Sequence, residues 1–262
     1  MAETITIETD GRGIATLTLA RAQKHNAMSA QMIAELTEAA HALGRDDAVR
    51  AVILTGAGRS FCAGGDLGWM RDQMQADAAT RAAEARKLAM MLQALDTMPR
   101  PLIGAVQGNA FGGGIGLMSV CDVVLAADHA RFALSETRLG LIPATIGPYV
   151  VARMGPARAR RVFMSARMFD ASEAVALGLV ARTVPAAALA EAALAEATAY
   201  LACAPGAVAE AKALVRALGP TIDEAVIETT VAALLARWES DEARDGIAAF
   251  FAREPAPWAT AQ

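Results

Sequence analysis

The fold is decided by two glycine-bearing segments, Ser60-Phe61-Cys62-Ala63-Gly64-Gly65-Asp66-Leu67 and Gly108-Asn109-Ala110-Phe111-Gly112-Gly113-Gly114. The first follows the apolar run Ala51–Leu54, and the second follows Leu102–Val106. Such short apolar runs are typical of strands buried on both faces of a parallel sheet, and glycine segments indicate tight turns into helices. A third apolar run, Asp122–Ala126, extends the pattern. Strands that alternate with helices predict an α/β fold with largely parallel pairing.

The flanking regions add a hairpin and several helices. Thr4–Glu8 and Ile14–Leu19 alternate polar and apolar residues around Asp10-Gly11-Arg12-Gly13, which predicts a β-hairpin. Ser29 is a candidate N-cap for the next helix, and Ala76–Leu95 has a strongly helical composition. We therefore expect an α/β core over residues 1–185 and a helical region over residues 186–262. The helices expected there are Ala186–Leu201, Ala207–Leu218, Ile222–Glu239 and Asp241–Arg253.

Composition excludes several classes of protein. With 55% hydrophobic residues and a net charge of −4, the chain is too apolar and too weakly charged to be intrinsically disordered. Three cysteines cannot hold 262 residues together as a disulfide scaffold. Since 24 Lys and Arg face 28 Asp and Glu, there is no basic excess to neutralise the phosphates of a nucleic acid. We expect no nucleic-acid partner.

The sequence also favours a protein that is not in a membrane. Met1–Asp10 carries acids and lacks the basic and apolar regions of a signal peptide. Pro101–Cys121 is free of charge and long enough to suggest a membrane span, but it contains many glycines together with Gln107 and Asn109. A buried strand, a glycine turn and a helix explain it better. We expect a cytoplasmic protein with reduced thiols.

Familiar catalytic motifs are missing. The three histidines are scattered, without the spacing of metal ligands, so neither a metal nor a redox cofactor is expected. Around Ser60 the second glycine of a hydrolase elbow is absent, and Gly112–Gly116 is not followed by the Lys-Ser/Thr of a phosphate-binding loop. Ser119 stands where a dinucleotide fingerprint needs its third glycine. Cys62 has no histidine near it in sequence, which favours an inert thiol.

The two glycine turns are themselves candidates for chemistry. Backbone N–H groups at the start of a helix have no partner and carry partial positive charge. Two such turns facing each other could hold an oxygen that becomes negative during a reaction. Glycine would let the backbone approach that oxygen closely. Tight turns that serve only close packing explain the same pattern, and the residues alone leave both interpretations open.

Several ordered motifs together resemble the crotonase superfamily of enoyl-CoA hydratases and isomerases. They are FCAGGDLGWM at 61–70, VQGNAFGGGIGL at 106–117, CDVVLAADHARFALSE at 121–136 and GLIP at 140–143. Arg21–Ala27 also resembles the family's R-P-x-x-x-N-A segment, with Ala22 in place of proline. The resemblance implies a spiral of ββα units and a helical C-terminal region that joins subunits into homotrimers or hexamers. It also implies an acyl-CoA substrate.

Carried over residue by residue, the resemblance assigns an oxyanion hole and a coenzyme A site. The backbone N–H groups of Gly65 and Gly113 would hold the thioester oxygen. The residues implied to bind coenzyme A or the acyl chain are Lys24, His25, Asn26, Ala63, Gly64, Asp66, Leu67, Trp69 and Gly112.

The resemblance departs from the family pattern at one of two glutamates. Hydratases of this family carry the first glutamate two residues after the glycine triplet, where this chain has Gly116. The second corresponds to Glu136, which burial among apolar neighbours would suit for acid/base chemistry. A single glutamate is compatible with hydration, with double-bond isomerisation, or with acyl-CoA binding without turnover.

A further resemblance favours hydration of a particular substrate class. Leu134–Val150 replaces the usual glycine-rich P-G-x-G-G-T-Q run and is similar to the bacterial methylglutaconyl-CoA hydratase branch, which also lacks the first glutamate. Such a substrate carries a second carboxylate, which would need a cation. The sequence does not choose among Arg71, Arg81, Arg86 and Arg138. We expect a hydratase acting on a branched, carboxylated enoyl-CoA, with an isomerase and a non-catalytic acyl-CoA-binding protein as the alternatives.

Overall fold

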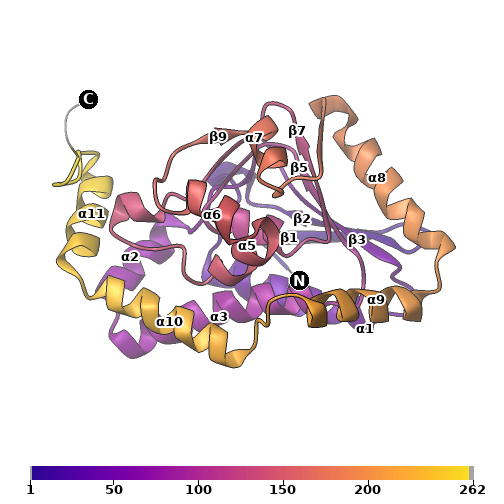
Figure 1. Ribbon diagram of the computed structural model, residues 1–262, viewed down its shortest axis with the longest axis horizontal. Coiled ribbons are helices and arrows are strands. Elements are labelled where there is room, and N and C mark those ends of the chain that lie inside the picture. The colour runs from indigo at the N-terminus through magenta and orange to yellow at the C-terminus, as the bar shows by residue number, and fades with distance from the viewer. Residues whose placement is uncertain (1, 260–262) are drawn as a thin grey trace.

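The computed structural model describes residues 2–259, which form two β-sheets surrounded by helices (Figure 1). The larger sheet has the strand order β1-β2-β3-β5-β7-β10, and the smaller has the order β4-β6-β8-β9. The larger sheet comprises β1 (Ile5–Thr9), β2 (Ile14–Leu19), β3 (Ala51–Gly56), β5 (Leu102–Val106), β7 (Val123–Ala127) and β10 (Arg182–Val184). The smaller comprises β4 (Ser60–Cys62), β6 (Asn109–Phe111), β8 (Arg131–Ala133) and β9 (Phe169–Asp170).

The N-terminal hairpin forms as the alternating pattern predicts. Strands β1 and β2 pair antiparallel, with Ile5 opposite Leu19 and Thr9 opposite Ala15. The Asp10 carboxylate accepts hydrogen bonds from the backbone N–H groups of Arg12 and Ile14, which fixes the turn between the strands. From β2 onward the larger sheet is parallel through β3, β5, β7 and β10. All five residues of β5 are buried, as expected of a strand covered on both faces.

The middle of the chain is a succession of ββα repeats. In each repeat the first strand joins the larger sheet, the second joins the smaller sheet, and a helix follows. The repeats are β3-β4-α2 (Leu67–Gln75), β5-β6-α4 (Gly113–Ser119) and β7-β8 followed by the short 3₁₀ helix η2 (Glu136–Leu139). The expected spiral of ββα units is thereby confirmed. It stacks the turns after β4, β6 and β8 side by side, because these strands are neighbours in the smaller sheet.

Helices cover the sheets where apolar faces allow it. Ser29 caps α1 (Ala30–Arg45) by accepting a hydrogen bond from the Met32 N–H, as predicted. The expected helix over Ala76–Leu95 is α3 (Ala78–Thr97), which starts two residues later because Asp77 is its N-cap. The other helices of this part are α5 (Gly147–Met154), α6 (Pro156–Phe163) and α7 (Ala171–Ala176).

Four α-helices lie between residue 186 and residue 259, and they pack on the core at different places. They are α8 (Leu189–Ala199), α9 (Pro205–Leu218), α10 (Glu224–Trp238) and α11 (Asp241–Ala252). Helix α8 buries Leu189, Ala193 and Ala197 against the larger sheet, and α10 packs along α3 through Ile227 and Val231. In Figure 1, α9 and α10 run along the lower edge and α11 lies at the left-hand end.

Within residues 2–259, no single helix is long and apolar enough to cross a membrane. One pair of consecutive helical segments, Ala186–Ala202 and Pro205–Leu218, is together long and apolar enough by length and composition alone, but the pair is bent by 109°.

Candidate active site

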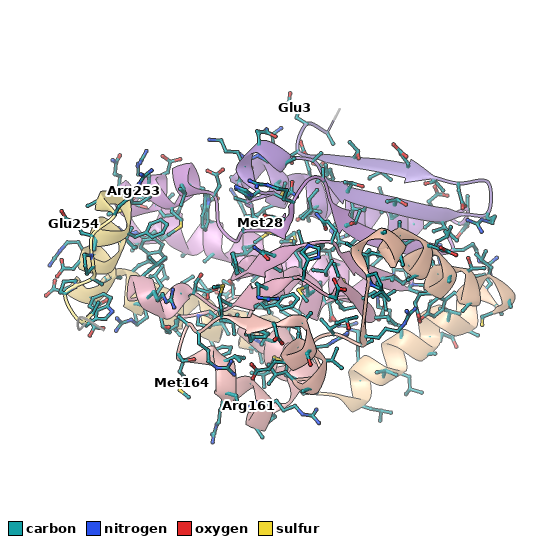
Figure 2. The ribbon with its side chains drawn as sticks, turned by 90° about the horizontal axis from the view of Figure 1, so that it is seen from above. Glu3, Met28, Arg161, Met164, Arg253 and Glu254 are labelled. Atoms are coloured by element: carbon teal, nitrogen blue, oxygen red, sulfur yellow. The ribbon has the colours of Figure 1, made fainter. Side chains whose placement is uncertain are left out.

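A cavity of about 580 Å³ lies where the turns after β4, β6 and β8 meet. Residues of the two glycine segments, of the segment from Ala133 to Ile146 and of helices α10 and α11 line it. Most of the lining is apolar. Met28, one of the lining residues, lies near the centre of the molecule in Figure 2. The ββα spiral therefore brings three separate stretches of sequence to one enclosed space.

The first glycine turn presents an unpaired backbone N–H. Met28 donates its N–H to the Gly64 carbonyl (2.8 Å), and the Asp66 N–H is donated to the Met28 carbonyl (2.9 Å). These bonds fix the backbone on both sides of Gly65, whose own N–H donates no hydrogen bond within the described residues. Gly64 has a φ of +93°, a conformation that favours glycine. Gly65 lines the cavity, so its N–H is available there.

The second glycine turn presents another such group. The Gly112 N–H is donated to the Ala133 carbonyl (2.9 Å), and Gly112 turns the chain into α4 with a φ of +48°. Gly113 is the first residue of α4, and its N–H has no acceptor among residues 2–259. A Cβ on Gly64 would lie 4.0 Å from the Gly113 nitrogen, so the two turns are in direct contact. Two free N–H groups thus border one cavity, an arrangement able to stabilise an oxyanion.

Glu136 is the carboxylate of this cavity. It starts η2, and its backbone carbonyl accepts a hydrogen bond from the Leu141 N–H (3.1 Å). Its Oε2 atom is sealed from solvent and has no hydrogen-bond partner in the described part of the chain. Burial raises the pKa of Glu136 from 4.5 to about 7. A carboxyl group with such a pKa can both take and return a proton near neutral pH.

The position of the missing first glutamate is filled by an apolar side chain. Gly116 is buried in α4, and a Cβ there would lie 2.5 Å from Cγ2 of Ile146 and 3.7 Å from Cδ1 of Leu92. A glutamate at position 116 would therefore collide with Ile146. The described cavity has one carboxylate in its lining, Glu136.

Of the four candidate arginines, only Arg138 lines the described cavity. Its guanidinium forms no ion pair or hydrogen bond with any residue in 2–259. The other three are engaged elsewhere: Arg71 stacks over the Phe251 ring at 4.6 Å, Arg81 pairs with Glu239, and Arg86 pairs with Glu224 and Glu228. The structure thus distinguishes candidates that the sequence does not.

Most of the other site residues assigned from the resemblance also meet at the cavity. Ala63, Gly64, Leu67, Trp69 and Gly112 line it. The indole N–H of Trp69, a residue of α2, donates a hydrogen bond to Glu84 of α3 (3.1 Å), which fixes the orientation of the ring.

Asp66 has a supporting position instead of a lining one. Its carboxylate caps α2 and pairs with Arg21 at 2.9 Å. Burial alone would raise its pKa, but the bonds from Arg21 and from the N–H groups of Trp69 and Gly68 hold the pKa below the usual value. Asp66 therefore remains charged and anchors the first glycine turn to the Arg21–Ala27 segment.

Lys24, His25 and Asn26 lie outside the cavity lining. Asn26 is fully buried, and its carboxamide bonds the Arg21 N–H and the carbonyls of Ala57 and Ser60. Because its polar atoms are already paired, the Asn26 side chain holds the loop together. Lys24 and His25 are exposed, and His25 Nδ1 lies 3.1 Å from Ser60 Oγ.

Four residues that line the cavity could not be identified from the sequence. Leu234, Trp238 and Phe250 line it from α10 and α11, and Met168 lines it from the segment before β9. These residues are 98 or more positions away from Glu136 or lie in an irregular segment, so no local pattern identifies them. Phe250 and Met168 are large apolar side chains that are exposed in the structure. Their exposure indicates a binding surface, but it is visible only in the folded chain.

Comparisons with known proteins agree with this fold. A family model described as enoyl-CoA hydratase/isomerase matches residues 9–261. The Mycobacterium tuberculosis protein named "probable enoyl-CoA hydratase echA8" is 41% identical over 185 residues, 70% of each chain. The crystal structure of an enoyl-CoA hydratase from Shewanella pealeana has a TM-score of 0.80 at 35% identity, covering 98% of this chain and 96% of that one. Pseudomonas aeruginosa AtuE has a TM-score of 0.80 at 37% identity, covering 98% and 100%.

The chain belongs to the enoyl-CoA hydratase/isomerase family, and its fold is that of the crotonase superfamily. It is an enzyme of this family whose substrate class is acyl-CoA thioesters.

Proposed function

We propose that this enzyme adds water to the α,β double bond of an enoyl-CoA thioester, with Glu136 as the acid/base and the N–H groups of Gly65 and Gly113 as the oxyanion hole. The observation that carries the proposal is the meeting of an unpartnered carboxylate with two unpartnered backbone N–H groups at one cavity. This reaction requires donors that stabilise the negative charge developing on the thioester oxygen, and a group that moves a proton.

The proposed step balances with Glu136 alone. The Glu136 carboxylate takes a proton from water as the water oxygen bonds to C3 of the enoyl group. The electron pair of the double bond moves toward the thioester carbonyl, and the resulting enolate oxygen is held by the Gly65 and Gly113 N–H groups. Glu136 then returns the proton to C2. One molecule of water is added, and the enzyme is regenerated in its starting state.

We further propose a substrate with a branched acyl chain and a second carboxylate, such as 3-methylglutaconyl-CoA. Arg138 supports this assignment, because it is a cation in the lining without an ion-pair partner in the described residues. Charge-assisted bonds from an arginine to a carboxylate are among the stronger polar contacts in proteins. An acyl chain ending in a carboxylate would give Arg138 the partner it lacks.

An assay series with three thioesters tests both parts of the proposal. Purified protein is offered crotonyl-CoA, 3-methylglutaconyl-CoA and a 3-enoyl-CoA, and hydration or double-bond movement is followed. We expect hydration by the wild type and its loss in Glu136→Gln. For Arg138→Gln we expect the KM for 3-methylglutaconyl-CoA to rise about tenfold, the effect of losing about 1.4 kcal/mol of binding, with little change for crotonyl-CoA. Arg71→Gln is the matched control.

The lone glutamate gives a second candidate function. An isomerase needs an oxyanion hole and one group that moves a proton, and it needs no reacting water. The absence of a glutamate at Gly116, where Ile146 takes up the space, is therefore compatible with isomerisation. Wild-type protein that moves only the double bond of the 3-enoyl-CoA would replace hydration with isomerisation. Acyl-CoA binding without either reaction would favour a non-catalytic protein.

We also propose that the chain assembles into trimers or hexamers through its C-terminal helices. Helix α9 supports this, since it buries no residue within the chain and exposes Leu214, Val215 and Leu218. Sedimentation equilibrium distinguishes the states, and a monomer at micromolar concentration would contradict the proposal. Changing Leu214 and Leu218 to serine should weaken the assembly if α9 takes part.

A further inference from the structure

A turn that follows η2 in the chain places two side chains in the lining of the active-site cavity. The Gly147 N–H is donated to the Ala144 carbonyl (3.0 Å), which closes a turn with Thr145 and Ile146 at its centre. Both central residues line the cavity. The turn therefore fixes the position of Thr145 relative to Ile146.

The same turn lies close to Glu136, because Ile146 of the turn and Glu136 both contact glycines at the start of α4. A Cβ on Gly112 would lie 2.9 Å from Glu136 Oε1, and a Cβ on Gly116 would lie 2.5 Å from Ile146 Cγ2. Gly112 and Gly116 are one helical turn apart, joined by a hydrogen bond of 3.2 Å from the Gly116 N–H to the Gly112 carbonyl. One turn of helix rises about 5.4 Å. Glu136 and Ile146 thus both lie against the first turn of α4.

Thr145 is a buried polar residue with an uncommitted hydroxyl. It is 6% exposed, and its hydroxyl makes no hydrogen bond within the part of the chain that the structure describes. The side-chain atoms there that are both sealed and unpartnered are Arg100 Nε and Glu136 Oε2. The Thr145 hydroxyl is not among them, so it retains access to the cavity that it lines. A buried hydroxyl kept open to a cavity is available to a ligand or to water.

Addition of water needs the water molecule to be oriented as well as deprotonated. One of its protons must point at Glu136, and a second contact must hold the other so that a lone pair faces C3. Ser135 and Arg138 reach the cavity from the same segment as Glu136, whereas Thr145 comes from a separate turn. A second contact from a different direction fixes the orientation of the water better than one from the same side.

We propose that the Thr145 hydroxyl, held beside Glu136 by the turn whose Ile146 fills the space over Gly116, accepts a hydrogen bond from the reacting water and orients it toward C3. This role rests on the proposed hydration. The water gives one proton to Glu136 and its oxygen to C3, and Glu136 passes that proton to C2. Thr145 keeps its own proton throughout, so it positions the water without taking part in proton transfer.

The test uses two variants of Thr145 and two reactions. Thr145→Val removes the hydroxyl at nearly constant shape, and Thr145→Ser retains it. Thr37→Val, which removes a hydroxyl bonded to the Ile33 carbonyl on α1, is the matched control. Hydration is measured with crotonyl-CoA and 3-methylglutaconyl-CoA. Exchange of the Cα protons of butyryl-CoA with solvent deuterium is followed separately, because it needs Glu136 and the oxyanion hole but no reacting water.

For Thr145→Val we expect the kcat of hydration to fall about 100-fold, the effect of a misplaced reacting group, with KM changed less than threefold. Thr145→Ser should keep at least a third of the wild-type kcat. Deuterium exchange should be unchanged in Thr145→Val and lost in Glu136→Gln.

Two results would overturn the role of Thr145. One is a Thr145→Val enzyme that hydrates within threefold of the wild type. The other is an equal loss of hydration and exchange, which marks a structural role. Wild-type protein that exchanges protons but hydrates neither thioester would overturn hydration itself, and this role with it.

Discussion

The backbone of Gly112 lies against the carboxylate of Glu136. A Cβ at position 112 would stand 2.9 Å from Oε1 and 3.5 Å from Cδ of Glu136. The same glycine has a φ of +48° and passes the chain into α4, so one residue sets both the start of the helix and the space for the carboxylate. Any side chain there would displace the proposed acid/base.

Gly112→Ala should reduce turnover by two orders of magnitude or more, because displacing Glu136 by about an ångström misaligns the proton transfer. Gly155→Ala is the matched control, since Gly155 also has a positive φ (+75°) but nothing within 4 Å of an added Cβ. We expect the control to lose stability alone. Steady-state kinetics and thermal unfolding separate the two effects, and equal activity in both variants would contradict the relationship.

The rate of the proposed hydration should follow the ionisation of Glu136. Its pKa is raised to about 7 by burial, and only the ionised form accepts a proton from water. We expect kcat/KM to rise about tenfold per pH unit below 7 and to level off above it. A profile measured between pH 5 and 9 tests this, and a rate independent of pH over that range would exclude Glu136 as the base.

The same ionisation should affect stability in the opposite direction. The pKa of Glu136 is about 7 in the folded protein and 4.5 in the unfolded chain, so the neutral carboxyl contributes to the free energy of unfolding. This contribution is fully present below pH 4.5 and is lost as the pH rises to 7. Glu136→Gln, which is always neutral, should be more stable than the wild type at pH 8 by at most about 3 kcal/mol. At pH 4 the two should agree. Denaturant unfolding at both pH values measures the difference.

Gly116 and Ile146 should be energetically coupled. Gly116→Ala brings a methyl group to 2.5 Å from Ile146 Cγ2 in a buried helix, and such overpacking costs about 1–3 kcal/mol. Ile146→Ala removes the obstructing atom and leaves a cavity. The double variant should therefore be more stable than the sum of the single effects predicts, by 1 kcal/mol or more. Strict additivity in denaturant unfolding would show that the two side chains do not compete for space.

Asn26 should matter for stability more than for binding. It is buried, it has a φ of +53°, and its carboxamide bonds three backbone groups. Asn26→Ala should cost about 3 kcal/mol of unfolding free energy, because those groups lose their partner in the interior. Gln23→Ala, at an exposed neighbouring position, should cost less than about 0.5 kcal/mol. A loss of acyl-CoA affinity at unchanged stability would instead show that Asn26 acts mainly in ligand binding.

Five of the six strands of the larger sheet could be predicted from the sequence, whereas β10 and the smaller sheet could not. Runs such as Ala51–Leu54 and Leu102–Val106 are long and apolar enough to indicate buried strands, and both form with nearly the predicted bounds. Strands β4, β6 and β8 have three residues each, too few for a periodic pattern. The sequence therefore assigns β4 and β6 to the glycine turns. Their pairing depends on the spiral as a whole and carries no local signal.

The site divides in the same way. Gly65, Gly113 and Glu136 could be assigned because each stands in a motif of its own, and the structure places all three around one cavity. Thr145 and Arg138 could not be ranked above other polar residues, because their proposed roles come from having no side-chain partner among the residues that the structure describes. Trp238 could not be found at all, since its approach to the cavity depends on how α10 packs along α3.

The packing of the last helices against the Glu136 segment has a consequence for biosynthesis. Arg237 donates a hydrogen bond to the Gly140 carbonyl (2.9 Å), and Phe250 forms part of the cavity lining. A ribosome makes the chain from the N-terminus, so the glycine turns and Glu136 emerge more than a hundred residues before Phe250. The nascent protein therefore passes through a stage in which Glu136, the proposed acid/base, exists without the residues of α10 and α11 that line the cavity. The lining is complete only after Phe250 has been synthesised.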